Sequence, residues 1–520
     1  MSESKKWDVV IVGSGISSLT AAIVLLEKGK SVLLLEKYRK PGGYLHCFNR
    51  YTCRFDTGAH YVGSMSKGQP FHTLLTYLGV LKNGPEEFFV RLDDNGFDVL
   101  KFPGAEIEVK NGIRETIQSF SKSYPAEEKA ISQFFLLSQE VARSFPTFEF
   151  NPDYDSAFVN KYMALTLKEV VENLTSNPGL QIALYAYCSL HGVAPADVSF
   201  GFHSLLIMSL LESAWGFRTG GDTLTKKFIE RIQELGGEIR LGAGVKGLRI
   251  EDKFVKAVKL ENDEEILCEN VISGVHPKQT FRWVGDENLK PAFKQRLQNT
   301  RESMGIFGIY AVSEIEPKMS RTKNYYVFDN LDPSKISDSL NGLGKPWAAY
   351  ISRTERIDEK RKYHPLTIHV PCSYRDFAKW LDKPVMKRGD DYENAKREFA
   401  EQSFEFIGKY FPDAISNITK YDTSTPLSNI HYNGSEEGSS YGIYHDIGHT
   451  GVRALGPRTP VRNLFITGQS TLFPGLYPSA ISGVRCAGNL IGIKPIIADL
   501  KTIQLQGRKE FSSSEAEPRI

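Results

Sequence analysis

The stretch Asp8-Val-Val-Ile-Val-Gly13-Ser14-Gly15-Ile-Ser-Ser18 decides the fold of this chain, because an apolar run leads directly into a glycine turn. A second apolar run ends at Glu36. Gly13 lets the chain turn tightly out of the first strand, and Gly15 lets the backbone approach a pyrophosphate closely. We predict a strand, a turn, a helix over 16–28 and a second strand that ends in a carboxylate, which is the order of a dinucleotide-binding unit.

Two further features of this stretch indicate what it binds. The start of the predicted helix would offer free N–H groups and the positive end of the helix dipole to a phosphate. Glu36 lies about 20 residues after Gly15, which is the spacing of an acid that hydrogen-bonds a ribose hydroxyl. Its alternative role is that of a solvated residue at a strand end. Ser18 stands where a third glycine is usual, but it is small enough for close packing of the helix on the strand.

Composition and charge narrow the class of protein. The chain has 520 residues, 41% apolar and 24% charged, which is typical of a globular protein of about two to four domains. Lys and Arg number 64 against 62 Asp and Glu, and this near balance argues against a dedicated nucleic-acid binder. The six cysteines show neither a CxxC pair nor a metal-ligand spacing, which indicates a reduced intracellular protein without a metal.

The chain ends and the apolar runs bear on localisation. Residues 1–6 run straight into the first predicted strand and leave no room for a signal peptide. The longest uncharged apolar run, 198–211, is too short to span a bilayer. We expect a cytoplasmic protein, either soluble or peripherally associated with a membrane. From about Gln506 the chain is polar and rich in Ser and Glu, and we expect disorder there.

Strand and helix patterns divide the chain into interleaved parts. A glycine pair at 220–221 opens a helix, and the C-terminal region predicts a strand over 463–467 and a helix over 479–491 that Ser479 caps. No second glycine-rich strand–turn–helix unit is evident, so we expect one permanently bound dinucleotide. The predicted nucleotide-domain parts are 1–81, 212–297 and 451–505, the substrate-side parts are 82–211, with a helical insertion, and 298–450, and 506–520 is a disordered tail.

These pieces, in this order, resemble the superfamily of flavin-dependent amine oxidases and phytoene desaturases, and within it the chain resembles the retinol saturases from Trp7 to about Ile491. Carotenoid isomerases share the flavin half but are less similar in the middle. The segments that carry the resemblance are 42–48, 55–63, 191–195, 324–328, 387–392, 441–446 and 467–469. Three departures leave the substrate open: Ser18, the lack of the N-terminal signal or anchor of the animal proteins, and a desaturase-like loop after Gln469.

The resemblance implies an α/β fold and an FAD cofactor. The expected architecture is a discontinuous Rossmann-like FAD-binding domain of the glutathione-reductase and amine-oxidase type, with an α+β substrate domain that contains a mixed or antiparallel sheet and a helical insertion. The residues assigned to FAD are Gly13, Ser14, Gly15, Ser18, Glu36, Lys37, Gly42, Gly43, Val245, Gly468, Gln469, Ala480 and Ile481. The C-terminal helix would point its N-terminus at the pyrimidine side of the flavin, where the dipole stabilises the anion formed on reduction.

The chemistry expected of such a site needs few catalytic side chains. Hydrogenation or dehydrogenation of a polyene passes a hydride between carbon and flavin N5, and a proton to or from the neighbouring carbon. We assign His60 and His445 as candidates for the proton transfer, with a structural role as the alternative for His60. His445 and His449 have an i, i+4 spacing, but Gly448 argues against a helix there, so we predict no metal.

We predict an FAD-dependent oxidoreductase that acts on C=C bonds of a long apolar retinoid, carotenoid or other lipid, with saturation favoured over desaturation or cis–trans isomerisation. The run 198–211 is either a wall of a hydrophobic tunnel near a membrane-facing mouth or a buried helix, and both can hold. NAD(P)H docking transiently, or a redox partner protein, would supply electrons. The alternative from another class is a lipid carrier like the Rab escort proteins. The oligomeric state stays open.

Overall fold

The first sheet is assembled from three distant parts of the chain. The computed structural model describes residues 5–336, 345–357 and 362–516. Four strands run parallel in the order β10-β2-β1-β13, and β19 pairs parallel with β13. Their bounds are β1 (Trp7–Val12), β2 (Val32–Glu36), β10 (Glu238–Leu241), β13 (Glu265–Ser273) and β19 (Leu464–Ile466), and the antiparallel strands β11 (Val245–Glu251) and β12 (Phe254–Leu260) extend the sheet. The near-continuous apolar runs of β1 and β2 are typical of parallel strands covered on both faces.

Three helices cover the nucleotide-binding unit: α1 (Ile16–Leu26), α10 (Gly221–Glu234) and α17 (Leu476–Ile491). Every residue of α1 is buried, and α1 ends two residues before the predicted Lys28. Gly483 of α17 lies so close to α1 that a Cβ atom there would stand 2.1 Å from the carbonyl oxygen of Ser17. The helix that begins the motif and the helix near the C-terminus therefore pack as one unit.

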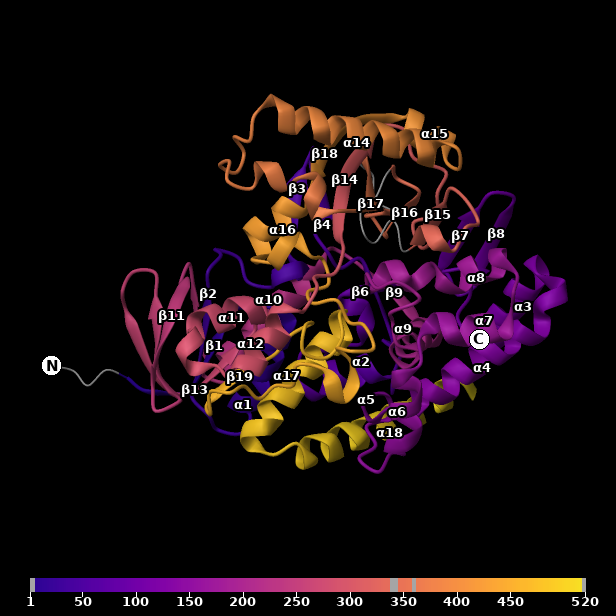
Figure 1. Cartoon of the computed structure of the whole chain (residues 1–520). Coiled ribbons are helices and arrows are strands. Elements are labelled where there is room, and N and C mark those ends of the chain that lie inside the picture. Colours follow the sequence, from indigo (N-terminus) through magenta and orange to yellow (C-terminus); the bar gives the residue numbers. More distant parts are fainter. Residues whose placement is uncertain (1–4, 337–344, 358–361, 517–520) are drawn as a thin grey trace.

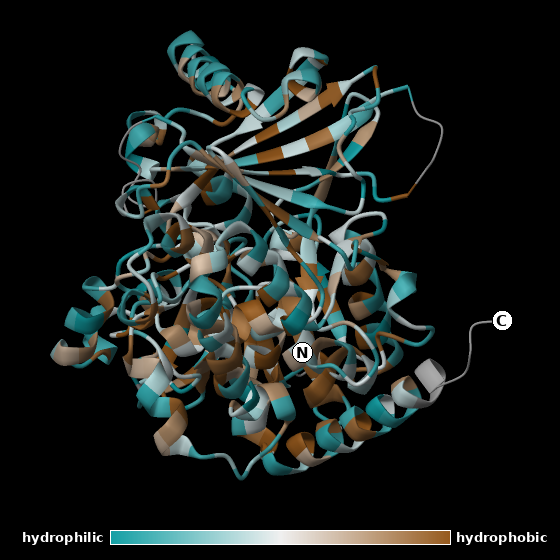
Figure 2. Cartoon of the chain, turned by 90° about the vertical axis from the view of Figure 1, so that its right-hand side faces the viewer, coloured by the Kyte–Doolittle hydropathy of each residue, from teal (hydrophilic) through white to brown (hydrophobic). Residues whose placement is uncertain are grey.

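A second, mixed sheet has the order β18-β14-β17-β16-β15-β7-β8. β15 pairs parallel with β7, and the other neighbours are antiparallel. The bounds are β7 (Asp98–Phe102), β8 (Ala105–Val109), β14 (Gly305–Ser313), β15 (Asn324–Phe328), β16 (Ala348–Arg353), β17 (His364–Cys372) and β18 (Ile418–Ser424). Helices α14 (Asp390–Gly408) and α15 (Pro412–Ser416) lie over its outer face, at the top of Figure 1. Figure 2 shows brown bands between pale and teal ones along these strands, as expected of alternating side chains.

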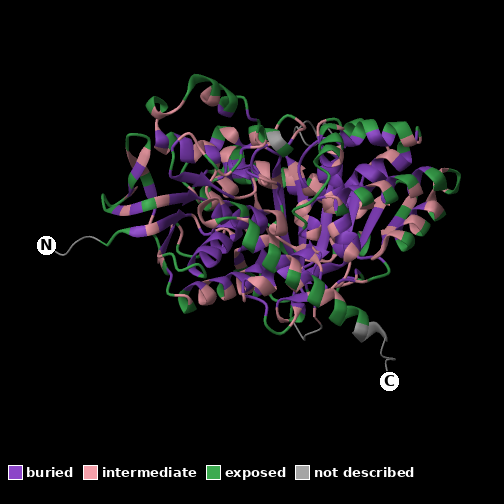
Figure 3. Cartoon of the chain, turned by 90° about the horizontal axis from the view of Figure 1, so that it is seen from below, coloured by how far each residue is buried: buried purple, intermediate pink, exposed green. Residues whose placement is uncertain are grey.

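The helical insertion lies between β8 and β9 in sequence, on the right of Figure 1. Its helices are α3 (Ile113–Ser123), α4 (Glu128–Arg143), α5 (Pro146–Glu149), α6 (Ser156–Ala164), α7 (Leu167–Leu174), α8 (Pro178–Tyr185) and α9 (Phe200–Glu212). A small sheet in the order β5-β9-β6 connects it to the N-terminal part, with β5 (Tyr61–Gly63), β6 (Phe89–Arg91) and β9 (Ala214–Phe217). Figure 3 shows buried residues along the inner strands and helices and exposed ones on the outer helices and loops.

The remaining elements are short or peripheral. The hairpin β3 (Cys47–Arg50) and β4 (Cys53–Asp56) follows the glycine pair at 42–43. The other helices are α2 (Pro70–Tyr77), α11 (Pro277–Val284), α12 (Pro291–Gln298), α16 (Pro426–Asn433) and α18 (Lys494–Ala516). With two large sheets, one Rossmann-like with a parallel core and the other mixed, the predicted α/β fold class is confirmed.

Two predictions at the C-terminal end are wrong. The predicted helix start and cap at Ser479 are incorrect, because α17 begins one turn earlier, after Gly475 at φ 109°, and Ser479 lies buried in its first turn. The predicted disorder is also incorrect over residues 506–516, because α18 continues to Ala516, and residues 517–520 of the predicted tail lie outside the described residues. Its buried residues Ile496, Leu500 and Gln504 are spaced as one helix face. In the described ranges, we find no helix of the length and apolar character needed to cross a membrane.

Candidate functional site

A cavity of about 1070 Å³ opens at the carboxyl edge of the parallel strands. Residues that directly follow β1, β13 and β19 line it, namely Gly13, Gly274 and Thr467, together with Glu36 at the end of β2. This edge is where ligands bind in open parallel sheets. The volume lies at the upper end of the ~300–1,000 Å³ usual for ligand pockets, so the cavity is large enough for a ligand of cofactor size.

The glycine turn leaves its backbone open to the cavity. Gly13 has a φ of 89°, which an L-residue rarely adopts, and its N–H donates to the carbonyl of Leu35 at 2.8 Å. Gly15 precedes α1 at φ −63°, and α1 starts without a side-chain cap from any described residue. No described atom lies within 4 Å of a Cβ built on Gly15. The first turn of α1 therefore presents unsatisfied N–H groups to the cavity, as an anion site requires.

The carboxylate of Glu36 is held by the turn that it faces. Its Oε2 accepts hydrogen bonds from the backbone N–H of Ser14, at 2.9 Å, and from the Ser14 hydroxyl. Its Oε1 accepts a hydrogen bond from the N–H of Tyr38 at 2.8 Å. Glu36 is half-buried and lines the cavity, so one fixed carboxylate stands beside the open glycine turn.

The glycine pair at 42–43 closes over the same turn. The N–H of Gly42 donates to the hydroxyl of Ser14 at 3.0 Å. Gly42 has a φ of 120°, and a Cβ there would lie 2.7 Å from the hydroxyl oxygen of Thr225 in α10. A Cβ on Gly43 would lie 3.6 Å from the Cα of Gly15, so the two glycine motifs approach each other by backbone alone. Both residues of the pair line the cavity.

Ser18 lies behind the cavity wall rather than on it. The residue is fully buried in α1, and a Cβ built on Gly274 would lie 2.0 Å from its hydroxyl oxygen. Because Gly274 has no side chain, the helix still packs closely on β13 although the third glycine of the motif is absent. The predicted packing role of Ser18 is thus compatible with the geometry, whereas direct contact with a ligand in the cavity is not.

The residues assigned to FAD in the C-terminal and central parts of the chain likewise include some that line the cavity and one that lies behind its wall. Gly468, Gln469 and Ile481 line the cavity, while Ala480 is fully buried behind it. Like α1, α17 starts without a side-chain cap in the described chain, and four residues of its first turn, 476–479, line the cavity. Lys37, exposed, and Val245, buried at the start of β11, line the end beside Glu36. Two helix N-termini therefore face one cavity.

The two candidate histidines occupy different places. His60 lines the cavity, its Nε2 has no hydrogen-bond partner in the described chain, and its ring lies 4.5 Å from that of His369. Burial, with the nearby His369 and Arg356, lowers the pKa of His60 well below its ordinary value. His445 lies outside the cavity lining, with its Nε2 2.8 Å from the carbonyl oxygen of Gln469. Burial lowers the pKa of His445 to about 4, so both rings are neutral near pH 7.

The far half of the cavity is aromatic and apolar. Helix α9, which contains most of the apolar run 198–211, is mostly buried and contributes Phe202, Leu205 and Leu206 to the wall. The run is thus both a buried helix and a cavity wall, while a membrane-facing mouth stays a prediction. Phe202 stacks on Phe473 with ring centroids 4.2 Å apart. Tyr326 of β15 lines the cavity, whereas its neighbour Tyr325 packs against Phe411 on the opposite face of the sheet.

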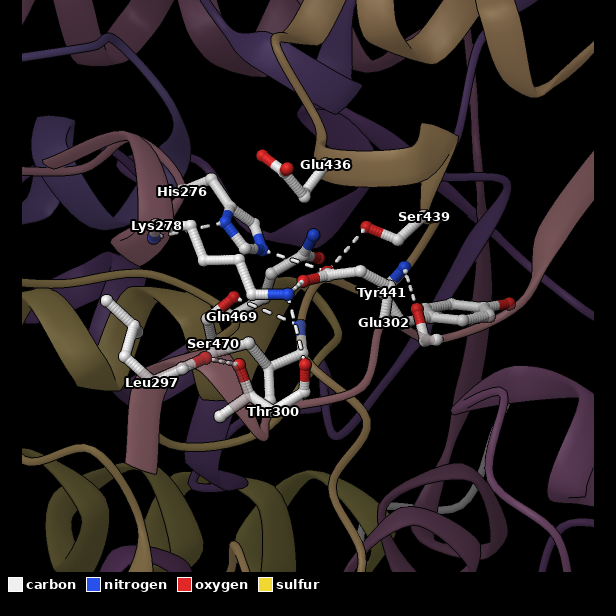
Figure 4. A network of polar contacts seen from close by, with 12 residues as sticks. His276, Lys278, Leu297, Thr300, Glu302, Glu436, Ser439, Tyr441, Gln469 and Ser470 are labelled. Carbon is white, nitrogen blue, oxygen red and sulfur yellow. Dashed lines mark hydrogen bonds and ion pairs between the residues drawn. The ribbon is translucent and has the colours of Figure 1, made fainter. Parts of the chain in front are cut away.

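A charged network that the sequence did not suggest borders the cavity (Figure 4). Glu302 is buried, and its carboxylate accepts a hydrogen bond from His276 Nε2 at 3.0 Å and pairs with Lys278 Nζ at 2.8 Å. Burial alone would raise the pKa of Glu302, but its bonds to His276 and Lys278 outweigh this and lower it. His276 lines the cavity, so the network fixes the wall that faces the glycine turn. Glu302 lies more than 20 positions after His276 and Lys278, and no motif links it to them.

One buried cluster in the described chain contains side chains of metal-binding type. Potential ligand atoms of Cys188, His191 and His203 lie within 4.8 Å of one another. His191 Nδ1 accepts a hydrogen bond from the N–H of Val193 at 3.3 Å, which leaves its Nε2 to donate to His203 Nδ1 at 3.1 Å. Because both ring nitrogens of His191 are used in these hydrogen bonds, the geometry favours a packed pair of neutral rings. The predicted absence of a metal stays a prediction.

Sequence comparison places the chain among known proteins. Residues 11–78 match the NAD(P)-binding Rossmann-like domain. The all-trans-retinol 13,14-reductase of Rattus norvegicus is 28% identical over 96% of this chain and 88% of its own length. The prolycopene isomerase of Daucus carota is 22% identical over 94% of this chain and 80% of its own length. The lycopene-forming phytoene desaturase of Pantoea ananas is 26% identical over 58% of this chain and 62% of its own length.

Solved structures share the fold. A redesigned putrescine oxidase superposes with a TM-score of 0.65 at 16% identity, covering 94% of this chain and 99% of that one. A Rab GDI from Plasmodium falciparum gives a TM-score of 0.51 at 11% identity, covering 94% of this chain and 99% of that one. The predicted resemblance is confirmed: over nearly its whole length the chain is similar to the all-trans-retinol 13,14-reductases and, more distantly, to a carotenoid isomerase, and over 58% of its length it is similar to a phytoene desaturase.

Proposed function

We propose that the protein is an FAD-dependent oxidoreductase that reduces a C=C bond of a long apolar polyene, in the manner of a retinol saturase. The observation that carries this proposal is one continuous cavity, which joins the glycine turn beside Glu36 to the apolar wall formed by α9. The similarity to retinol reductases, a prolycopene isomerase and a phytoene desaturase supports this class of substrate.

The residues present fit the cofactor. The open space above Gly15 and the uncapped start of α1 suit a pyrophosphate, and the carboxylate of Glu36 suits a ribose hydroxyl. The uncapped start of α17 suits a flavin ring that gains negative charge on reduction. When bound, FAD would supply the two-electron chemistry by accepting or giving a hydride. NAD(P)H, docking transiently, is the proposed electron donor.

The chain's own residues would bind the substrate and exclude water. The aromatic and aliphatic side chains of Phe202, Leu205 and Phe473 would hold the hydrocarbon, with a gain of about 0.8 kcal/mol for each buried CH₂ group. Neutral His60 stands at the same wall with an unused ring nitrogen, which suits a hydrogen bond to a polar end of the substrate. Gln469, whose carbonyl is held by His445, would hydrogen-bond the ribityl chain of the cofactor.

Desaturation and cis–trans isomerisation remain alternatives within the same enzyme class, since relatives of each kind are similar to this chain. A lipid carrier is the alternative from another class, because a Rab GDI shares the fold. The glycine turn, the fixed carboxylate of Glu36 and the two uncapped helix starts favour the enzyme, since a carrier has no need of a dinucleotide site.

Colour and product mass test this proposal. Purified protein should be yellow or should take up FAD, and protein that cannot do so would support the carrier. Reduced holoenzyme incubated anaerobically with all-trans-retinol, a carotenoid or an unsaturated fatty acid should yield a product heavier by two hydrogens. A product lighter by two hydrogens would indicate desaturation, and an unchanged mass with a shifted retention time would indicate isomerisation.

A further inference from the structure

Behind the aromatic half of the cavity lies a buried carboxyl group that is linked to the cavity wall by hydroxyl groups. Asp98, the first residue of β7, is fully buried. Its Oδ2 accepts hydrogen bonds from the hydroxyls of Tyr61, at 2.9 Å, and Tyr187, at 2.7 Å. Its Oδ1 accepts a hydrogen bond from the side-chain amide of Asn324 at 2.9 Å. The carboxyl group is therefore fully enclosed and hydrogen-bonded on both oxygens.

The hydrogen bonds continue from this carboxyl group to the cavity. The hydroxyl oxygens of Tyr61 and Tyr326 are 2.7 Å apart, and both residues line the cavity, whereas Asp98 and Tyr187 do not. Because a hydroxyl has one proton and can turn, the chain Asp98–Tyr61–Tyr326 has two directions. When Asp98 is ionised, each hydroxyl donates toward the carboxylate. When Asp98 is protonated, each donates away from it, and the proton of Tyr326 points to the cavity.

Other polar groups of this wall are poorly suited to deliver a proton. Burial lowers the pKa of His369 to about 4 and that of His60 well below its ordinary value, so neither ring carries a spare proton near pH 7. The hydroxyl of Tyr441 donates to the backbone carbonyl of Ser189 at 2.9 Å, and that of Tyr350 donates to Asn324 at 3.0 Å. By contrast, the hydroxyl of Tyr61 hydrogen-bonds directly to the carboxyl group of Asp98, and the hydroxyl of Tyr326 is linked to that group through Tyr61.

We propose that Asp98, Tyr61 and Tyr326 form a proton-delivery chain whose last hydroxyl, that of Tyr326, protonates the substrate carbon next to the one that receives the hydride. This inference rests on the proposed function. The π bond of the C=C pair breaks while the σ bond remains, as a hydride, with two electrons that come from the reduced nicotinamide, adds to one carbon and leaves a carbanion on the other. The O–H bond of Tyr326 breaks as the new C–H bond forms. Tyr61 then reprotonates Tyr326, Asp98 reprotonates Tyr61, and the remaining carboxylate later takes a proton from water.

The pKa shifts along the Asp98–Tyr61–Tyr326 hydrogen-bond chain agree with proton transfer from Asp98 toward the cavity. Burial raises the pKa of Asp98 to about 6, against the opposing hydrogen bonds from Asn324, Tyr187 and Tyr61 and the positive charge of Arg356. Tyr350, on the neighbouring strand β16, also interacts with this carboxyl group, since burial and the charge of Asp98 both help to raise the pKa of Tyr350. Burial also raises the pKa of Tyr61, Tyr187 and Tyr326 well above the ordinary value, so all three hydroxyls hold their protons at neutral pH. A group that titrates near neutrality can be reloaded in each cycle.

A single turnover of dithionite-reduced holoenzyme with all-trans-retinol, in D₂O and without oxygen, tests the chain. Tyr326→Phe should bind FAD as the wild type does and slow product formation by ~10²–10⁴-fold. Tyr410→Phe is the matched control, since its hydroxyl donates to a carbonyl of the same strand, that of Phe328, at 2.6 Å, and lies away from the cavity. Equal rates for Tyr326→Phe and the wild type would overturn the proposal.

An infrared titration of the carboxylic acid band supplies a readout that needs no turnover. Burial raises the pKa of Glu212 to about 7, so Glu212 contributes a band of its own. The wild type should show a further band that protonates near pH 6, and that band should be absent in Asp98→Asn. Tyr61→Phe removes a hydrogen bond that favours the carboxylate, so the midpoint should move to higher pH. Carboxylic acid bands that titrate identically in the wild type and in Asp98→Asn would overturn the assignment. If the bands behave as expected but the wild type forms no reduced product, the proposed function fails. The hydrogen-bond chain from Asp98 through Tyr61 to Tyr326 is then still supported.

Discussion

Ser14 donates hydrogen bonds from both its backbone N–H and its hydroxyl to one carboxylate oxygen of Glu36. The N–H of Tyr38 binds the other oxygen. These three donors occupy three of the about four acceptor positions of a carboxylate, so one position is left for a ligand. Glu36 therefore has two tasks, since it fixes the glycine turn from which the first turn of α1 begins and it offers the remaining acceptor to the cavity.

Replacing Glu36 by Gln should weaken FAD binding by about 10- to 100-fold, since a hydrogen bond to a charged group contributes ~1.5–3 kcal/mol. The amide would also place an N–H₂ group opposite the N–H of Ser14 or of Tyr38. Quenching of flavin fluorescence on titration of the apoprotein measures the change. An affinity equal to that of the wild type would remove Glu36 from the cofactor site.

Gly15→Val should separate folding from cofactor binding. The φ of Gly15, −63°, is allowed for valine, and the space around its Cβ is open in the described chain, so thermal stability should change little. The side chain would fill the space above the first turn of α1, and FAD uptake should be lost. Gly13→Ala is the contrasting variant, because its φ of 89° strains any side chain and should lower stability by about 1–2 kcal/mol. Full FAD uptake by Gly15→Val would contradict the assigned pyrophosphate site.

The Glu302 network should make stability depend on acid pH. Because the pKa of Glu302 is lowered in the fold from a value of 4.5, its ionised form stabilises the protein above pH 4.5, and that contribution is lost as the pH falls. Glu302→Gln should be less stable at pH 7 by about 2 kcal/mol, and the difference should shrink below pH 4.5. The exposed pair of Arg282 and Glu436 is the control, and Glu436→Gln should cost less than about 1 kcal/mol. Thermal melting at several pH values measures both, and a gap that stays constant with pH would contradict the assignment.

Asp98 should show the opposite pH dependence. Its pKa is raised from 3.8 to about 6, so the fold favours the protonated form and loses stability as the pH rises through this interval. Asp98→Asn keeps the shape and removes the charge, and its amide can donate to the hydroxyls of Tyr61 and Tyr187. We expect the variant to be more stable than the wild type above pH 6, by up to ~3 kcal/mol, and equally stable below pH 4. A variant that is less stable at pH 7–8 would show that Asp98 is favoured as a carboxylate.

The local motifs predicted the N-terminal strand–turn–helix–strand unit well. The order of β1, the glycine turn, α1 and β2, and the position of Glu36, follow from residues that are close in sequence, where turn geometry and strand periodicity dominate. The predicted end of α17 at Ile491 is confirmed, whereas its predicted start at Ser479 is wrong. Ser479 was an apparent cap, yet Gly475, at a positive φ, breaks the chain one turn earlier and leaves the helix start uncapped.

The predictions failed where contacts between distant residues decide the structure. The polar composition after Gln506 indicated disorder, but α18 is held by packing of Ile496 and Leu500 and by a two-pronged ion pair between Arg508 and Glu149. The spacing of four from Ile496 to Leu500 to Gln504 was the available signal. The Asp98–Tyr61–Tyr326 chain joins three segments, and no local pattern indicates that a carboxyl group lies behind these tyrosines.

The most direct test of the account is the mass of the product that dithionite-reduced, FAD-loaded protein forms from all-trans-retinol under anaerobic conditions. We predict a product heavier by two hydrogens, formed by the wild type and not by Gly15→Val. A retinol pool of unchanged mass, recovered from wild-type protein that has bound and reduced its flavin, would contradict the proposed reduction of a polyene.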